Sequence, residues 1–146
     1  MKSVVFIGHD ECYEVTSEEV EKQILKCIKK GATHFYSGGQ GGFDRLSARC
    51  VDRLKLTHRN IKNILVVPYP TFTVFDKECF DEIIFADGFE KYHYKAAIPK
   101  RNRYMVERCD AAICFVSHGW GNAVKTYEYA KRKGLEIMNL ANYNES

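Results

Sequence analysis

The chain repeats one local pattern three times: a short apolar run leads into a glycine-containing polar loop, and a helical pattern follows. The three apolar runs are residues 4–7, 34–37 and 111–116. Parallel strands joined by helices place all such loops at one edge of a sheet. Glycines let backbone N–H groups approach a ligand closely, and helix N-termini favour negative charge. The pattern therefore predicts one composite cleft suited to an anion.

The rest of the chain alternates between apolar runs and amphipathic stretches. A first helix begins after Thr16, which forms a capping-box pattern with Glu19, and ends before Gly31. Strands are predicted at residues 3–7, 33–37, 63–67, 111–116 and 136–140. The other helices are predicted at residues 42–55, 100–108 and 123–133. This alternation predicts a single domain over residues 1–146 with an α/β fold, a Rossmann-like three-layer sandwich with a mainly parallel sheet.

Residues 71–99 are harder to interpret because aromatic side chains dominate them. A short helix near residues 76–79 and a strand near residues 82–85 are expected. The aromatic residues of this segment are Phe72, Phe75, Phe80, Phe85, Phe89, Tyr92 and Tyr94. One small sheet edge does not readily cover so many large side chains, so we expect an exposed patch and a homodimer. The alternative is that they cover the core of a monomer.

Composition narrows the function classes. The net charge of +3 permits an anionic small ligand but does not demand a nucleic-acid surface. No run reaches the roughly 18 apolar residues of a membrane span, and the N-terminus lacks signal-peptide architecture, so we expect a cytoplasmic protein. The six cysteines include no C-x-x-C pair, and the histidines are not spaced as metal ligands usually are. We therefore expect neither a metal nor a cofactor.

The second glycine loop is the sharpest local signal. Four of its five residues from 38 to 42 are glycine, which is neither a G-x-G-x-x-G fingerprint nor a Walker P-loop. A backbone cradle for phosphate or ribose, with Asp44 near the helix start, is favoured over a flexible turn. In the first loop, His9 can donate to a phosphate, act as an acid–base group or simply cap the loop, and His118 has the same alternatives.

The third loop leads into a helix that carries Thr126 and Glu128. Their hydroxyl and carboxylate can point towards the cleft, although Glu128 can equally be a solvated helix residue. Trp120, the only tryptophan, is better explained by stacking on a ring or by an oligomer contact than by the core. Arg101 and Arg103 are predicted near a helix N-terminus just after Pro99, where two guanidiniums oppose the helix dipole and a bound anion would relieve the conflict.

Taken with their neighbours, these motifs resemble the SLOG superfamily over nearly the whole chain. This Rossmann-like group includes the Lonely Guy cytokinin-activating enzymes, the Smf-type DNA-processing proteins and many small bacterial and phage proteins. The resemblance rests on residues 6–10, 37–44, 100–106 and 121–130, and the Arg-Asn-Arg-x-Met-Val segment is its most specific piece. It implies a nucleotide-derived ligand at the strand edge, and some members take part in anti-phage signalling. Hydrolytic members pair through helices beside the active site, which also implies a homodimer.

The resemblance also suggests a catalytic pair. Arg101 or Arg103 would hold phosphate and Glu128 would assist cleavage, as in the hydrolytic branch. However, Asp10 replaces an arginine common in small members, and the Pro-Gly-Gly-x-Gly-Thr motif has lost its proline and has Lys125 in place of a glycine.

The resulting hypothesis is a binding module that senses or sequesters a nucleotide or an ADP-ribose-like signal. The alternative is an N-glycosidic-bond hydrolase of nucleoside 5′-monophosphates, in which Arg101 and Glu128 are catalytic. DNA binding is disfavoured by the near-neutral charge. The predicted ligand-binding residues are Gly8, His9, Asp10, Ser37, Gly38, Gly39, Gly41, Gly42, Asp44, Arg101, Asn102, Arg103, Gly119, Trp120, Gly121, Asn122, Thr126 and Glu128.

Overall fold

The protein is built on one sheet of six strands that all run in the same direction. The computed structural model describes residues 1–86, 88–91 and 93–143; Tyr92 of the aromatic segment and the last three residues of the predicted domain lie outside this description. The spatial order of the strands is β4-β3-β2-β1-β5-β6, and every neighbouring pair is parallel. The strands are β1 (Ser3–Gly8), β2 (His34–Ser37), β3 (Lys62–Val66), β4 (Glu82–Ile84), β5 (Ala111–Phe115) and β6 (Glu136–Asn139). The predicted α/β sandwich is confirmed.

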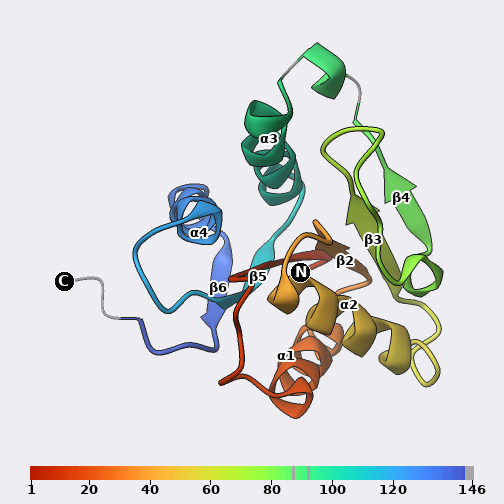
Figure 1. Ribbon diagram of the computed structural model, residues 1–146. Helices are drawn as coiled ribbons and strands as arrows, with labels where there is room; N and C mark the ends of the chain where they lie inside the picture. Colours follow the sequence, from red (N-terminus) through yellow and green to blue (C-terminus); the bar gives the residue numbers. More distant parts are fainter. Residues whose placement is uncertain (87, 92, 144–146) are drawn as a thin grey trace.

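Helices cover both faces of this sheet (Figure 1). Helices α1 (Ser17–Lys29) and α2 (Gly42–Leu54) pack on one face, where Phe6, Phe35 and Phe43 form the centre of a buried cluster. Helices α3 (Tyr94–Glu107) and α4 (Asn122–Arg132) cover the other face. Two short 3-10 turns, η1 (Lys77–Cys79) and η2 (Phe89–Lys91), flank β4 in sequence. Within the described residues, no helix is long and apolar enough to span a membrane.

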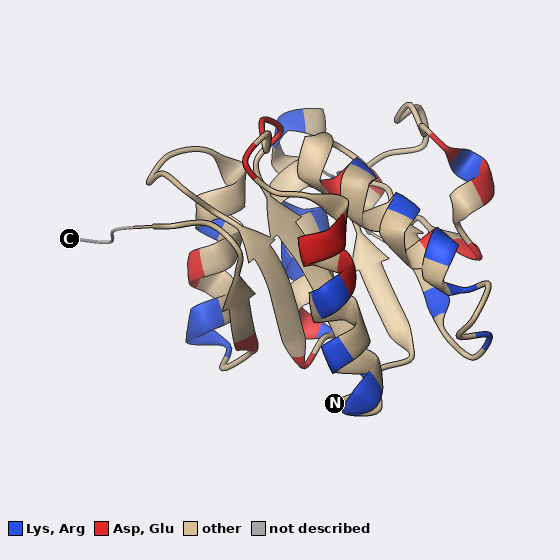
Figure 2. Cartoon of the chain, turned by 90° about the horizontal axis from the view of Figure 1, so that it is seen from below, with Lys and Arg blue, Asp and Glu red and all other residues tan. Residues whose placement is uncertain are grey.

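Helix α1 begins and ends as its sequence predicts. The Thr16 hydroxyl accepts from the backbone N–H of Glu19 at 3.2 Å, and the Glu19 carboxylate accepts from the N–H of Thr16 at 3.1 Å. Figure 2 shows acidic residues at the start of this helix and basic residues towards its end, which complements the helix dipole. Gly31 follows with a φ of 102°, the left-handed conformation of a terminating glycine.

Helix α3 contradicts the sequence prediction at its start. It begins at Tyr94 rather than near residue 100, and Pro99 lies inside it. The His93 side chain caps the helix by accepting from the N–H of Lys95 at 3.3 Å, and the N–H of Ala97 already bonds to the His93 carbonyl at 2.9 Å. A proline this close to the helix start removes one internal hydrogen bond but leaves the capped first turn intact. Arg101 and Arg103 therefore lie well inside the helix, and the predicted conflict with its dipole does not arise.

The strand order determines where a crevice forms at the edge of the sheet. The chain passes from β1 through α1 to β2 on one side, whereas β5 lies on the other side of β1. The loops after β1 and β5 consequently diverge at the carboxyl ends of these two strands. A crevice at such a reversal of strand order is the usual ligand site of open parallel sheets.

Candidate functional site

A cavity of about 450 Å³, here called the central cleft, opens at this reversal point. That volume is typical of small-molecule sites, which span roughly 300–1,000 Å³. The loop after β1 forms one wall, the glycine loop before α2 a second, and the loop before α4 a third. Arg101, Asn102 and Met105 of α3 contribute the remaining side. Loops from three parts of the sequence thus meet at one edge, as their placement after parallel strands predicts.

The glycine loop before α2 is shaped by close packing inside the protein. A Cβ on Gly38 would lie 2.6 Å from the guanidinium carbon of Arg101. Gly39 has a φ of 63°, and a side chain there would also meet Leu65 at 2.7 Å. A Cβ on Gly41 would lie 3.0 Å from the Cα of Asp10, and one on Gly42 would overlap the Asp10 carbonyl. Each of these glycines has an internal steric reason, so none requires a ligand to explain it.

Asp10 occupies the N-terminus of α2. Its Oδ1 accepts from the backbone N–H of Gly42 at 2.9 Å, and the carbonyl of His9 accepts from the N–H of Phe43 at 3.3 Å. A carboxylate at this end of a helix satisfies free N–H donors and complements the dipole. The most obvious anion position of the glycine loop is therefore taken by a side chain of the protein itself.

Arg101 is the largest fully buried side chain, with 2% of its surface exposed. Its Nη1 donates to the carbonyls of Gly38 at 2.8 Å and Val66 at 3.1 Å. Its Nε donates to Asn102 Oδ1 at 2.7 Å and its Nη2 to Gln40 Oε1 at 2.6 Å. Burial lowers the pKa of Arg101 to about 10, so the guanidinium stays charged at neutral pH. Of its five N–H donors, only one Nη2 proton lacks a partner in the described part of the chain.

Asp44 supplies an acceptor beside this guanidinium. Its Oδ2 accepts from the backbone N–H of Gln40 at 3.2 Å, and the residue lines the central cleft. Burial raises the pKa of Asp44 above its ordinary value, while the charge of Arg101 opposes that shift. The cleft thus offers a carboxylate acceptor of the kind that binds ribose hydroxyl groups.

Three aromatic rings that line the central cleft form a column. The His9 ring stacks on His118 with 3.6 Å between ring centroids, and His118 stacks on Trp120 at 3.7 Å. His9 Nε2 accepts from the backbone N–H of Ser117 at 3.0 Å, which places the proton of the neutral ring on Nδ1. Burial lowers the pKa of His9, and the neighbouring His118 adds to this effect. The column therefore joins the loop after β1 to the loop after β5.

The start of α4 faces the cleft with its backbone donors open. Gly121 precedes the helix with a φ of 98°, and no side chain in the described residues caps this end. No acidic residue lies in the first turn. The Thr126 hydroxyl donates back to the carbonyl of Asn122 at 2.9 Å, which leaves its oxygen able to accept. Unlike α2, α4 therefore presents free N–H groups to a ligand.

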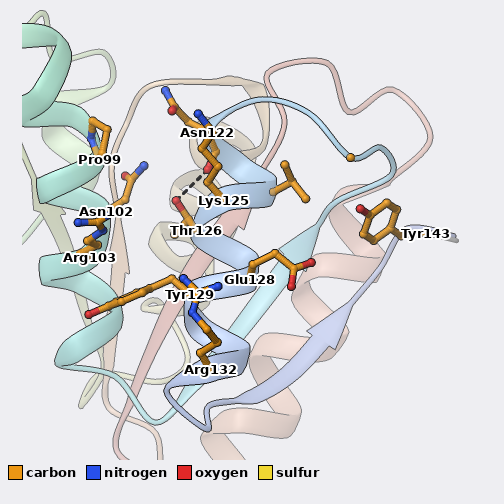
Figure 3. Close-up of a pocket in the computed structure, with 12 residues that line it drawn as sticks. Pro99, Asn102, Arg103, Asn122, Lys125, Thr126, Glu128, Tyr129, Arg132 and Tyr143 are labelled. Carbon is orange, nitrogen blue, oxygen red and sulfur yellow. Dashed lines mark hydrogen bonds between the residues drawn. The ribbon is translucent and has the colours of Figure 1, made fainter. Parts of the chain in front are cut away.

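A second cavity of about 440 Å³, here called the helical pocket, lies between α3 and α4. Figure 3 shows Arg103 on α3 facing Tyr129 on α4, whereas the Glu128 carboxylate points away from α3 towards Tyr143. The Arg103 guanidinium lies 5.7 Å from the centre of the Tyr129 ring. Asn102, Asn122 and Thr126 line both cavities, so the two hollows adjoin across the first turn of α4.

The predicted residues divide between these cavities. The central cleft is lined by the predicted residues Gly8, His9, Asp10, Gly41, Asp44, Arg101, Asn102, Trp120, Gly121, Asn122 and Thr126. The helical pocket is lined by Asn102, Arg103, Gly119, Asn122, Thr126 and Glu128. Ser37, Gly38, Gly39 and Gly42 line neither of the two. The predicted catalytic residues Arg101 and Glu128 consequently lie in different cavities.

Sequence reasoning missed several polar residues that line the two cavities, among them Gln40 and Lys125. Gln40 holds Arg101 from within the glycine loop, and its position as the one polar residue among four glycines was the available signal. Lys125 lines the helical pocket, and it stands where the resemblance leads one to expect a glycine. Among the described residues, no group of three or more His, Cys, Asp or Glu gathers to hold a metal ion.

The fold and the cleft define a Rossmann-like domain with a cavity at the carboxyl ends of its parallel strands. The model of the YspA SLOG family matches residues 3–143, and the chain belongs to that family. It is 27% identical to the SPbeta prophage-derived protein YoqJ of Bacillus subtilis, which is uncharacterized, over 73% of this chain and 74% of that protein.

Two solved structures share the fold. DNA processing protein A of Helicobacter pylori, described for its single-stranded DNA binding mode, superposes with a TM-score of 0.68 at 14% identity, over 99% of this chain and 67% of that chain. DNA processing protein A of Streptococcus pneumoniae superposes with a TM-score of 0.67 at 19% identity over 94% of this chain. The present chain spans half the length of the pneumococcal one.

Proposed function

We propose that the protein binds a nucleotide or a nucleotide-derived ligand, such as an ADP-ribose-like signal, in the central cleft and acts as a sensor or sequestering protein. Membership of the YspA SLOG family supports this class of ligand. The observation that carries the proposal is the contrast between the two helix starts at the cleft. Asp10 caps α2, whereas no side chain in the described part of the chain caps the first N–H groups of α4. A phosphate therefore binds at α4, where the dipole and the free donors favour an anion.

The remaining groups of the cleft fit the other parts of such a ligand. The Nη2 proton of Arg101 that has no acceptor among the described residues adds a charged donor from α3. Asp44 offers an acceptor for ribose hydroxyls. This division assigns phosphate to the α4 side and sugar to the glycine-loop side.

Hydrolysis of an N-glycosidic bond is the second candidate. The observation that favours it is that Arg103 and Glu128 line the same cavity. A binding role is preferred because Arg101 is fully engaged in the fold apart from one proton, and because Glu128 points away from α3 (Figure 3). A ligand that extends from the central cleft past Asn122 would still reach the helical pocket.

Nucleic acid is not proposed as the ligand. The similarity to DNA processing protein A rests on 14% and 19% identity, which carries the fold alone. The net charge is +3, and Figure 2 shows acidic and basic residues interspersed over the helices seen from that side. A single-stranded DNA groove normally gathers positive charge along one track.

The direct test is mass spectrometry of small molecules released when the purified protein is denatured. We expect a retained compound with at least one phosphate and a ribose. If nothing is released, the stripped protein is titrated with AMP and with ADP-ribose by calorimetry. Absence of a retained nucleotide together with absence of binding heat for both compounds would reject the proposal.

A further inference from the structure

One large and strongly exposed side chain of the central cleft is an aromatic ring. Trp120 has 72% of its surface exposed, although it is the largest apolar side chain that the cleft contains. Its stacked partner His118 covers one ring face at 3.7 Å with an interplanar angle of 18°. So large an exposed ring at a concave site indicates that a binding partner contacts it.

The column beneath Trp120 holds this ring in place. His9 has 7% of its surface exposed and is held at two points: its ring Nε2 accepts from the backbone N–H of Ser117, and its backbone N–H donates to the Phe115 carbonyl at 3.2 Å. His118 lies flat on His9 with an interplanar angle of 12°. Trp120 is therefore presented by a stack anchored in β1 and β5, which lowers the entropy lost when a further ring is added to it.

We propose that Trp120 is the platform on which the nucleobase of the ligand stacks, so that the column of His9, His118 and Trp120 continues into a fourth, planar heteroaromatic ring. This inference rests on the proposed function. The centroid spacings of 3.6 Å and 3.7 Å already match the distance of stacked aromatic rings. Trp120 is also two residues before Asn122, so their Cα atoms are at most about 7.6 Å apart. A nucleotide bridges that distance, with its base on Trp120 and its phosphate at the start of α4.

This arrangement assigns separate parts of the ligand to separate groups. The base contributes stacking energy on Trp120, which depends little on which base it is, because every base has a π-face. The phosphate contributes charge-assisted bonds at α4. A compound that lacks the base should therefore bind without any contribution from Trp120.

The chain contains one tryptophan and nine tyrosines, so fluorescence excited selectively at tryptophan reports on this platform alone. We would titrate wild type, Trp120→Phe and Trp120→Ala with AMP and with ribose 5-phosphate, following binding by calorimetry and, in wild type, by fluorescence. Tyr13→Ala is the matched control, because Tyr13 is an exposed aromatic residue (90%) that does not line the cleft. Circular dichroism and thermal unfolding establish that each variant is folded.

AMP is expected to quench Trp120 fluorescence. Trp120→Ala should bind AMP at least about fivefold more weakly, in line with stacking contributions measured for single bases, and Trp120→Phe should retain most of the affinity. Ribose 5-phosphate affinity should be the same in all variants, and Tyr13→Ala should match wild type for both compounds.

Two results would separate the two proposals. If wild type binds AMP but Trp120→Ala binds it equally well, the platform is wrong and the nucleotide function stands. If wild type retains no nucleotide and gives no heat with AMP or ADP-ribose, the function itself fails and the platform with it. Loss of a dimer in Trp120→Ala with AMP affinity unchanged would overturn the platform and assign Trp120 to a contact between copies.

Discussion

Arg101 donates to the carbonyl of Gly38 at 2.8 Å, and the same guanidinium fills the space that a side chain on residue 38 would need. The two residues are 63 positions apart, so this contact ties α3 to the end of β2. Arg101 therefore has two roles: it holds the glycine loop in place, and it lines the cleft.

The first prediction concerns stability. Arg101→Ala removes four hydrogen bonds and leaves the carbonyls of Gly38 and Val66 without their donor. Removing a buried, hydrogen-bonded charged group of this kind lowers the free energy of unfolding by about 3 kcal/mol or more. Urea unfolding measures this cost. Arg103→Ala, at an exposed position of the same helix, is the control and should change stability by less than about 0.5 kcal/mol. Equal free energies of unfolding for the two variants would show that Arg101 does not stabilise the fold through its bonds to the glycine loop.

The second prediction concerns pH. In the unfolded chain His9 has the ordinary pKa of 6.5, and in the folded protein its pKa is lower. Between these two pKa values the unfolded state binds more protons than the folded state. The stability associated with neutral His9 is therefore complete above pH 6.5 and is lost as the pH falls through the folded pKa. Protonation also removes the acceptor for the N–H of Ser117, so Trp120 fluorescence should change over the same range.

The control for this pH dependence is His9→Gln. Its amide oxygen can accept from the N–H of Ser117 without titrating. Unfolding midpoints and Trp120 fluorescence of both proteins would be compared from about pH 7.5 to about pH 5. A pH dependence that is identical in wild type and His9→Gln would show that the His9 bond does not control the loop.

Much of the fold could be predicted from the sequence because its signals are local. The capping box at Thr16, the glycine at position 31 and the apolar runs of the strands all act within a few residues, and the elements that they predict are present. Helix α3 was misplaced because Pro99 resembles a helix-start signal, whereas the true cap is His93.

The site was harder to predict because its decisive contacts join distant parts of the chain. Arg101 meets Val66 across 35 positions, and Asp10 caps a helix that begins 32 positions later. From the sequence, the four glycines predict a cradle for a ligand. The structure shows that Arg101, Leu65 and Asp10 occupy the space around them. No local pattern carries that information.

The third prediction tests hydrolysis. Glu128→Gln keeps the shape of the side chain and removes its charge. If the protein cleaves nucleoside monophosphates, wild type releases free base, which chromatography detects, and Glu128→Gln does not. Glu18→Gln on the opposite face of the sheet serves as the control and should behave as wild type. Equal release by wild type and Glu128→Gln would exclude this mechanism, and no release by wild type would favour a binding protein.

The fourth prediction concerns assembly. The aromatic segment is partly packed within the chain, because Phe89 contacts Tyr104 at 5.6 Å between ring centroids, yet Phe75, Ile83 and Tyr94 stay exposed. We expect a homodimer that covers this surface, with a mass about twice the 16.9 kDa of one chain by light scattering at micromolar concentration. Ile83→Lys places a charge on the edge strand β4 and should shift the protein to monomer. A wild-type mass of one chain, unchanged on dilution or added nucleotide, would mean that the segment packs within its own subunit.

The central claim is that phosphate binds to the free N–H groups at the start of α4, and one pair of variants tests it most directly. Asn122 is the first residue of α4, where proline is well tolerated, so Asn122→Pro removes one N–H and leaves the helix intact. Asn122→Ala removes the side chain but keeps that N–H. By calorimetry, Asn122→Pro should bind AMP at least about tenfold more weakly than Asn122→Ala, the effect of losing one charge-assisted hydrogen bond. Equal AMP affinity in the two variants would contradict the account.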